Sequence, residues 1–310
     1  MKKVILTGGA GFIGSNILKN LIKLKYHVVV IDDLSSGKFS NIEFLKNNKY
    51  FGFEKCSITN YKYLNNVFKN VDFVLHQAAS KKTVCDKDPR KDLKVNAEGA
   101  FNLLKLSSDN NVKKFIHAST GSVFGENKIN KSQNENSIKK PVSYYGVSKN
   151  AAENYIEVFN KLFNLNYTIL RYFHVYGPNQ DYSPNGGVIS IFINNLIKRK
   201  PITIYGDGSQ QRLFTYVEDV VRANMFSINN KKTNNQIYNC TYGKRIKLID
   251  ALNLISKNLK LYPNDLIYSN WKQGDIKNFN VSNQKLIRSG FEYKYNFELG
   301  IKKTIKSFYK

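Results

Sequence analysis

Cysteine is scarce in this 310-residue chain, and its three cysteines, Cys56, Cys85 and Cys240, lie far apart without the spacing of a metal site. A disulfide framework or a zinc site is therefore not expected, and a reducing cytoplasm is the predicted compartment. Long apolar runs are also lacking, since none approaches the roughly 20 residues that a membrane helix needs. Residues 1–9 place only a short apolar stretch before glycine, which predicts a strand and a turn rather than a signal peptide.

Acidic residues are few, with 23 Asp and Glu against 48 Lys and Arg and a formal net charge of +25. Such a balance is typical of proteins that bind nucleic acid. The lysines are nevertheless spread along the whole chain, so we favour a solvated lysine surface over a nucleic-acid groove. The positive field would still attract a doubly charged phosphate substrate. Hydrophobic residues make up 42% of the chain, which is enough for a sizeable core and excludes wholesale disorder.

Strand-like and helix-like stretches alternate in the first half, as in a parallel sheet with crossover helices. Buried strands are predicted at residues 4–6, 28–31, 73–75, 115–116 and 167–170, and helices at 12–24, 96–107 and 145–163. After Arg171, Pro and Gly cluster, and a helix at 188–200 leads to a strand at 202–205. The predicted fold class is α/β, with a doubly wound parallel sheet at 1–172 and a smaller mixed α/β domain at 173–310. Later segments are allowed to return to the first domain.

A glycine-rich turn follows the first predicted strand and opens a helix, with glycines at positions 8, 9, 11 and 14. Glycine lets the turn be tight and lets the backbone touch a pyrophosphate, which then lies on free N–H groups at the positive end of the helix. Asp32 closes the second predicted strand, where a carboxylate can accept both adenosine ribose hydroxyls and repel a 2′-phosphate. The pattern predicts a Rossmann domain that binds NAD rather than NADP. Asp33 competes for the ribose, and the simpler alternative is a turn that only starts a helix.

Tyr145 and Lys149 lie four residues apart at the start of a predicted helix, so they share one face. A phenol titrates near pH ~10, and a nearby ammonium together with an oxidised nicotinamide would lower that pKa enough for general-base catalysis. Alone, this spacing is common and an exposed helix face explains it as well. Ser119 and Thr120 end the preceding strand at the edge where open α/β sheets bind ligands, and Thr120 can relay a proton to the tyrosine. The alternative is that both hydroxyls only satisfy backbone groups.

These motifs occur in a characteristic order together with residues 76–79 (HQAA), 96–99 (NAEG), 170–178 (LRYFHVYGP), 206–212 (GDGSQQR) and 274–275 (GD). In this order they resemble the extended short-chain dehydrogenases/reductases of the nucleotide-sugar epimerase/dehydratase group, over essentially the whole chain. The resemblance implies that residues 1–172 bind NAD and that residues 173–310 mainly bind a nucleoside-diphosphate sugar. A homodimer, formed through the helices at 96–107 and 145–163, is expected by the same analogy.

The residues after Thr120 separate the branches of this family. Relatives that eliminate water carry Asp-Glu there, and decarboxylating relatives resemble Thr-Ser-Glu, whereas this chain has Gly121 and Ser122. The resemblance therefore implies a 4-epimerase of the UDP-glucose/UDP-galactose type. A 4,6-dehydratase or UDP-glucuronate decarboxylase of the same family is the alternative. A more remote one is an NAD-sensing regulator that binds nucleic acid.

In the mechanism that the resemblance implies, the C4 hydroxyl proton passes to Tyr145, directly or through Thr120, while hydride passes from C4 to NAD. The keto sugar then turns and is reduced on its other face. Lys149 holds the nicotinamide ribose and tunes the tyrosine, and Thr120, Tyr145 and Lys149 are the implied catalytic residues. The implied cofactor contacts are Gly8, Gly11, Phe12, Ile13, Gly14, Asp32, Asp33, Ser57, Ile58, Gln77, Ala78, Ala79, Lys81, Asn96, Ser119, Tyr145, Lys149 and Phe173.

The implied substrate contacts are Lys81, Thr120, Tyr145, His174, Val188, Thr203, Tyr205, Arg212, Lys272, Asp275 and Phe279. Arg212 can bind phosphate bidentately and is the strongest candidate for the diphosphate. His174 replaces an asparagine of relatives, which implies an altered or pH-dependent diphosphate contact. Ser57 replaces an aspartate that meets adenine, which implies weaker NAD binding. The bulky Phe279 favours a plain hexose over an N-acetylated one.

Overall fold

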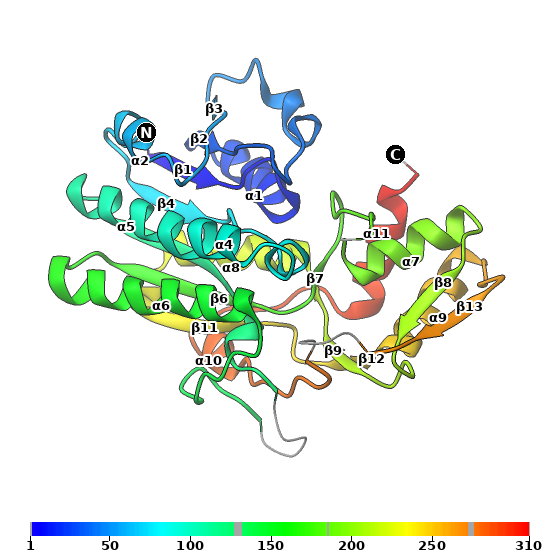
Figure 1. The fold of residues 1–310 in the computed structure, drawn as a ribbon. Coiled ribbons are helices and arrows are strands. Elements are labelled where there is room, and N and C mark those ends of the chain that lie inside the picture. The colour runs from blue at the N-terminus through cyan, green and yellow to red at the C-terminus, as the bar shows by residue number, and fades with distance from the viewer. Residues whose placement is uncertain (1, 127–131, 185, 272–275, 310) are drawn as a thin grey trace.

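The computed structural model describes residues 2–126, 132–184, 186–271 and 276–309. Its centre is a seven-stranded sheet in the order β11-β6-β5-β4-β1-β2-β3, with every neighbouring pair parallel (Figure 1). The strands are β1 (Lys3–Thr7), β2 (His27–Ile31), β3 (Phe51–Glu54), β4 (Phe73–His76), β5 (Lys114–Thr120), β6 (Tyr167–Tyr172) and β11 (Gln236–Cys240). The strand order reverses between β1 and β4, which confirms the doubly wound fold and creates a crevice at the carboxyl ends of these strands.

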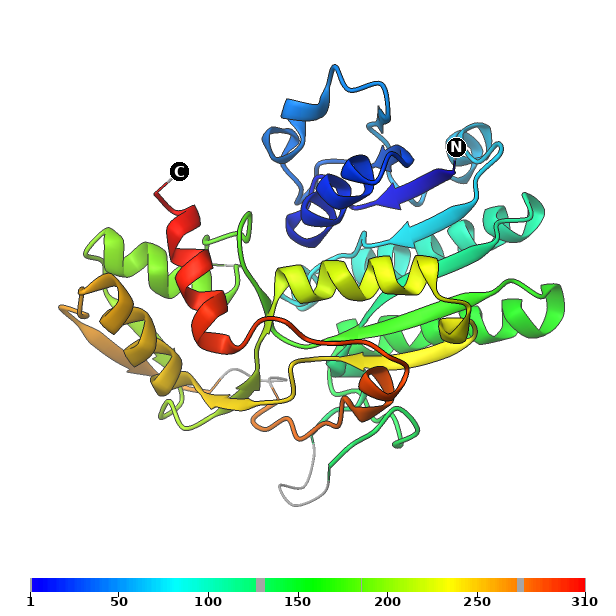
Figure 2. The same cartoon turned by 180° about the vertical axis from the view of Figure 1, so that it is seen from behind.

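Helices cover both faces of this sheet. On one face lie α2 (Tyr61–Val67), α5 (Gly99–Asp109) and α6 (Tyr144–Phe163), and on the other α1 (Phe12–Lys23) and α8 (Val217–Asn229) (Figures 1 and 2). Alternate residues of β1 serve the two cores, because Val4 and Leu6 pack with α1 whereas Ile5 packs with α5. Burial on both faces explains why the strands read as continuous apolar runs.

The carboxyl-terminal half builds a smaller layer beside the carboxyl ends of the strands. Three strand pairs lie there: β7 (Val175–Tyr176) with β10 (Thr215–Tyr216), β8 (Ile202–Tyr205) with β13 (Leu266–Ser269), and β9 (Gln211–Leu213) with β12 (Arg245–Lys247). The helices α7 (Val188–Ile197), α9 (Leu248–Leu259) and α11 (Phe297–Ser307) enclose a separate core that includes Tyr176, Phe192 and Phe214 (Figure 1).

Short elements complete the fold, and several border the crevice. They are α3 (Lys82–Cys85), α4 (Pro89–Asp92), α10 (Gln284–Arg288), the 3₁₀ turns η1 (Phe39–Asn41), η2 (Glu43–Leu45), η4 (Gly121–Val123) and η5 (Lys231–Thr233), and the π-helical η3 (Leu93–Glu98). The helix predicted at 96–107 therefore begins as a π turn and becomes regular only at Gly99. Within the described parts of the chain, no helix combines the length and the apolar character that crossing a membrane requires.

Two strands of the sheet escaped sequence-based prediction. The residues of β3 are only half-buried at the sheet edge, and β11 comes from far along the chain to pair with β6. The chain thus crosses residue 172 and returns, through α8 and β11, to the sheet it left.

Candidate active site

A cleft of about 880 Å³ opens at the carboxyl ends of the parallel strands. It is lined by the glycine turn after β1, by the loops after β2 and β4, by the end of β5, and by the start of α6. Several residues between positions 172 and 182, the end of α7 and the end of α11 contribute to its other wall. This is the position at which doubly wound sheets bind ligands.

The glycine turn forms a backbone cradle at one end of the cleft. Gly8 has a φ of +68°, and a Cβ there would come within 2.6 Å of the Ala78 nitrogen. A Cβ at Gly14 would overlap the carbonyl oxygen of Gly8. The N-cap of α1, Gly11, makes no side-chain capping bond, so the first N–H groups of this helix face the cleft without a side-chain acceptor. Side-chain-free backbone at a helix N-terminus fits the pyrophosphate of a dinucleotide.

Two adjacent carboxylates, both expected at the adenosine ribose, lie at the end of β2. Asp32 is buried, and its two oxygens accept hydrogen bonds from Ala10 N and Leu34 N, each at 2.9 Å. Burial raises the pKa of Asp32, against the lowering effect of these two bonds. Asp33 is exposed and accepts a bond from Ser35 N at 2.9 Å. Both residues line the cleft. Asp32 is buried in its wall, whereas Asp33 is exposed to solvent.

Sequence reasoning missed the loop that follows these carboxylates. Ser35, Ser36, Gly37 and Lys38 line the same end of the cleft as Asp32, together with the later Ser40 and Asn41. A Cβ at Gly37 would come within 2.9 Å of Asp32 Oδ1, so this glycine packs directly on the carboxylate. The polar run directly after the second strand was the signal available in the sequence.

Most predicted cofactor contacts meet in this cleft. Its lining includes the expected residues Gly8, Gly11, Phe12, Ile13, Gly14, Ser57, Ile58, Gln77, Ala78, Ala79, Lys81 and Ser119. Lys81 forms an ion pair of 3.4 Å with Asp181, which joins the loop after β4 to the opposite wall.

Asn96 and Phe173 do not line the cleft. Asn96 is 1% exposed and clamps Ser80 from behind, accepting from Ser80 N at 2.8 Å and donating to Ser80 O at 3.2 Å. Phe173 is buried against Phe279 and belongs to a separate apolar cluster. Both residues lie inside the wall of the cleft and are not exposed on its surface.

Tyr145 and Thr120 line the cleft together, from α6 and from the end of β5. Ser143 caps α6 by accepting from Gly146 N at 3.2 Å, which fixes the helix start beside the strand end. Burial raises the pKa of the Tyr145 phenol above its ordinary value, while a side-chain hydrogen bond with Thr120 acts in the opposite direction. The expected lowering is therefore not produced by the protein around Tyr145, because losing hydration costs the phenolate more than its neighbours restore.

Lys149 lies one turn further along α6 and is 1% exposed. Burial lowers the pKa of Lys149 to about 8, and the carboxylates Glu153 and Asp92 oppose that shift. The residue is not part of the cleft lining and is enclosed within the wall behind it.

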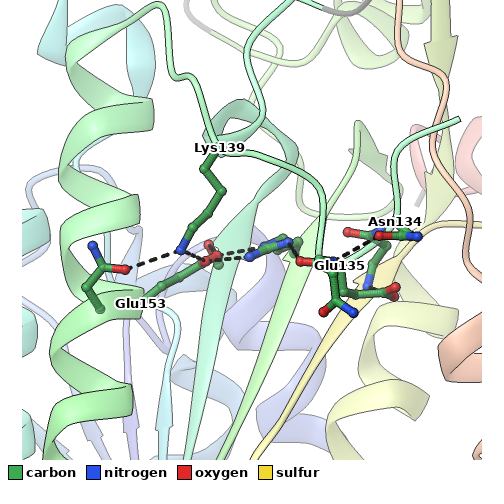
Figure 3. Close-up of polar contacts among 9 residues, drawn as sticks. Asn134, Glu135, Lys139 and Glu153 are labelled. Carbon is green, nitrogen blue, oxygen red and sulfur yellow. Dashed lines mark hydrogen bonds and ion pairs between the residues drawn. The ribbon is translucent and has the colours of Figure 1, made fainter. Parts of the chain in front are cut away.

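A buried ion pair supports the end of β5. Arg171 donates from its guanidinium to both carboxylate oxygens of Glu153, at 2.9 and 2.7 Å, and Ser119 Oγ donates to the same carboxylate at 2.6 Å. Lys139 reaches Glu153 at 3.5 Å from the loop above (Figure 3). Burial raises the pKa of Glu153, but Arg171 and the other donors outweigh it, so the carboxyl titrates below its ordinary range.

The predicted substrate contacts are only partly brought together. His174 lines the cleft with a left-handed φ of +37°, and its ring packs edge-on against Phe279 at 5.0 Å. Burial and the Arg212 charge hold the pKa of His174 well below its usual value. Arg212 is 7% exposed and donates to Lys277 O at 3.0 Å. The predicted contacts Val188, Thr203, Tyr205, Arg212 and Phe279 lie outside the cleft lining, and Lys272 and Asp275 fall outside the described residues.

Comparison with known proteins gives a consistent result. The family model described as "NAD dependent epimerase/dehydratase family" matches residues 4–241. A UDP-glucuronate 4-epimerase from Thermodesulfobacterium geofontis is 30% identical over 313 residues, covering 97% of this chain and 94% of the relative.

Two solved structures are similar over nearly their whole length. UDP-glucose 4-epimerase from Thermotoga maritima, solved with UDP-glucose, has a TM-score of 0.93 at 34% identity and covers 99% of this chain and 98% of its own. UDP-glucose 4-epimerase from Thermus thermophilus, solved with NAD, has a TM-score of 0.92 at 31% identity and covers 99% of each chain.

Proposed function

Because this chain belongs to the NAD dependent epimerase/dehydratase family, we propose that it is a 4-epimerase of a nucleoside-diphosphate hexose, of the UDP-glucose/UDP-galactose type. Its cofactor is NAD, as the sequence predicts, and its fold is that of the NAD-bound relatives. The finer assignment depends on one observation. Thr120 and Tyr145 line the cleft together, Lys149 lies one turn further along α6, and the turn after β5 carries no carboxylate.

Packing excludes a carboxylate at the first position of that turn. A Cβ at Gly121 would overlap the ring of Phe173, so an aspartate there would require this buried ring to move. The next residue, Ser122, accepts a hydrogen bond of 3.2 Å from Thr120 Oγ1. Elimination of water needs an acid and a base beside the sugar in addition to C4 oxidation. This turn provides neither, which supports epimerisation over the alternative dehydratase or decarboxylase chemistry.

The side chains of the protein would divide the work as follows. Tyr145 takes the proton of the C4 hydroxyl, either directly or through Thr120, whose side chain is hydrogen-bonded to the phenol. The Lys149 ammonium and the positive charge of bound NAD would together have to lower the pKa of this phenol. When bound in the cleft, NAD supplies the acceptor and donor of hydride at C4. Gly8, Gly14 and the start of α1 would hold its pyrophosphate, and the carboxylates at the end of β2 its adenosine ribose.

Fewer of the predicted substrate contacts than of the predicted cofactor contacts line the cleft. His174 and Arg212, together with Lys272 and Asp275, would bind the diphosphate, and Tyr205 would lie near the base. Val188, Thr203 and Phe279 complete the proposed set of substrate contacts. The buried Phe279 supports His174 from behind, and its bulk favours a plain hexose. The net charge of +25 assists capture of such an anionic ligand.

We further propose that the protein is a cytoplasmic homodimer. Apolar side chains are exposed along the outer face of α5 and α6, including Phe101, Tyr155, Val158 and Leu162. An exposed apolar patch on two neighbouring helices supports association there. Light scattering of the wild type and of Leu162→Glu tests it, since the charge at a position 67% exposed should yield monomers. An unchanged dimer would place the interface elsewhere.

One experiment tests the function directly. The purified protein is incubated with UDP-glucose, UDP-galactose, UDP-N-acetylglucosamine, UDP-glucuronate, dTDP-glucose, GDP-mannose and CDP-glucose, and products are identified by NMR. Interconversion of UDP-glucose and UDP-galactose without added reductant is expected. A 4-keto-6-deoxy sugar would identify a dehydratase, and carbon dioxide a decarboxylase. Specific, steeply salt-dependent binding of nucleic acid without turnover would favour the regulator.

A further inference from the structure

A buried carboxylate, Asp92, lies behind the catalytic turn of α6. Asp92 ends α4 and is 3% exposed. Its Oδ1 atom accepts three hydrogen bonds, from Ser148 Oγ at 2.9 Å, Asn96 Nδ2 at 2.6 Å and Cys85 Sγ at 2.8 Å. All three donors are neutral groups, so they satisfy the oxygen without cancelling its charge.

Two buried carboxylates, Glu153 and Asp92, act on the buried Lys149. Arg171 and Glu153 bind one another through two hydrogen bonds and are 1% and 0% exposed. Glu153 is thereby bound to a buried cation, whereas the hydrogen bonds to the Asp92 carboxylate, within the described part of the chain, come from neutral groups. A buried charge is costly unless an opposite charge lies near it. Ser148, the residue directly before Lys149, is the one that donates to Asp92.

We propose that Asp92 is a positioning residue of the active site, whose carboxylate fixes the first turns of α6 through Ser148 and keeps the buried Lys149 in its ammonium form. The inference rests on the proposed function only in treating Lys149 as a catalytic group.

The groups that face Lys149 come from five elements, and two of them carry charge. Glu153 of α6 and Asp92 of α4 raise the pKa of Lys149, as does Cys85 of α3, against the larger effect of burial. Burial and a hydrogen bond to Asp92 raise the pKa of the Cys85 thiol to about 12, so it is neutral at physiological pH. His76 of β4 and His117 of β5 are buried, and burial holds their pKa values well below the usual one, so they are neutral too.

The Asp92 carboxylate also acts on Tyr145. It favours the charged form of Lys149 but disfavours the charged form of Tyr145. The negative charge of Asp92 contributes to raising the pKa of the phenol, although burial is the larger cause. Removing that charge should therefore lower the pKa of both groups: it favours the phenolate and disfavours the ammonium. A residue with only a packing role would change neither titration.

The π-helical turn η3 connects Asp92 to the cofactor side of the wall. Asn96 within this turn donates to Asp92 and also holds Ser80, whose backbone borders the cleft. Both contacts are made by the side-chain amide of Asn96, which lies in the π turn four residues after Asp92. Such turns are frequent at functional sites. Asp92 thus joins α6 to the loop that follows β4.

The test compares the full-length wild type with Asp92→Asn, Ser148→Ala and a control, Asp109→Asn. Asp109 is an exposed carboxylate at the end of α5, paired with Lys105. The titration of Lys149 is followed by its ¹³Cε NMR signal in lysine-labelled protein, assigned by its absence from Lys149→Met. In Asp92→Asn the pKa of Lys149 should fall below the value of about 8 expected for the wild type. In Ser148→Ala and Asp109→Asn the charge near Lys149 is kept, and the titration should stay near that of the wild type.

An unchanged Lys149 titration in a folded Asp92→Asn protein would overturn the inference. Should that variant unfold, urea denaturation of Lys149→Met and of the double variant decides the matter. If the two charges balance one another, the double variant will regain a cooperative urea transition that Asp92→Asn alone lacks; a double variant that stays unfolded would contradict that balance. Neither measurement uses turnover, so a wild type that fails to convert nucleotide sugars would refute the proposed function and leave this inference standing.

Discussion

Ser119 Oγ donates a hydrogen bond of 2.6 Å to Glu153 Oε1, which ties the end of β5 to the buried partner of Arg171. Ser119 lines the cleft, whereas Glu153 is fully buried in α6. The strand and the helix that carry Thr120 and Tyr145 are therefore held together by one carboxylate. The position of the catalytic hydroxyls depends on an ion pair that does not itself line the cleft.

Replacing Glu153 by Gln should destabilise the protein strongly. The change leaves the Arg171 guanidinium buried without an anion, for which about 3–5 kcal/mol is expected. Urea denaturation measures the free energy of unfolding. Lys139→Met serves as the matched control. It removes the 3.5 Å contact with Glu153 and a 3.2 Å bond to Asn154 Oδ1 from a lysine side chain that is 23% exposed, and it should cost less than about 1 kcal/mol. Equal losses in the two variants would contradict this account of the ion pair.

Replacing Tyr145 by Phe should remove turnover while the protein keeps its NAD. Loss of a general base typically lowers kcat by about 10²- to 10⁴-fold. Nucleotide-sugar conversion and the absorbance of bound cofactor are measured on the same sample. The adjacent Tyr144 is 57% exposed, and Tyr144→Phe, which removes the same atom one residue away, should behave as the wild type. Near-normal activity of Tyr145→Phe would discard the role assigned to the phenol.

Replacing Gly14 by Ala should weaken NAD binding. The new methyl group would overlap the Gly8 carbonyl, and the turn must open to relieve that contact. We expect a loss of affinity of about tenfold or more, which corresponds to about 1.4 kcal/mol. Gly52→Ala is the control, because a Cβ there meets its nearest neighbour, Val29, at an ordinary 3.6 Å. Calorimetric titration with NAD should separate the two variants, and equal affinities would argue against a cradle at this turn.

Lys114 predicts a pH dependence of stability. Its ammonium is buried and donates to Ser227 O and Thr233 Oγ1, and burial lowers its pKa from 10.5 to about 8. Between these two values the unfolded chain binds more protons than the folded one. The contribution of Lys114 to stability therefore rises with pH across this window, by about 1.4 kcal/mol per unit.

The measurement is urea denaturation of the wild type and Lys114→Met at pH 7, 8, 9 and 10. The stability of the wild type relative to the variant should increase above pH 8. Lys113→Met is the control, because Lys113 is exposed and paired with Asp72 at 2.6 Å, and its difference from the wild type should lack that rise. A Lys114 difference that stays flat with pH would mean that this amine titrates normally.

Local patterns in the sequence were sufficient for much of the fold and for the cofactor half of the site. The strands at 4–6, 28–31 and 73–75 were found because buried parallel strands are continuously apolar, and the structure confirms them. The glycine turn, Asp32 and the spacing of Tyr145 and Lys149 are equally local signals. Each depends on a few neighbouring residues, so it can be recognised before the chain is folded.

The sequence by itself thus determined which residues could carry the chemistry, whereas the tertiary structure decided what surrounds them. No local pattern brings β11 beside β6, or Asp92 against Ser148, because these contacts join residues about 60 positions apart. The upward shift of the Tyr145 pKa likewise follows from burial, and not from the lysine four residues away. Hydration and charge are set by everything packed around a group, and that packing exists only once distant segments have met.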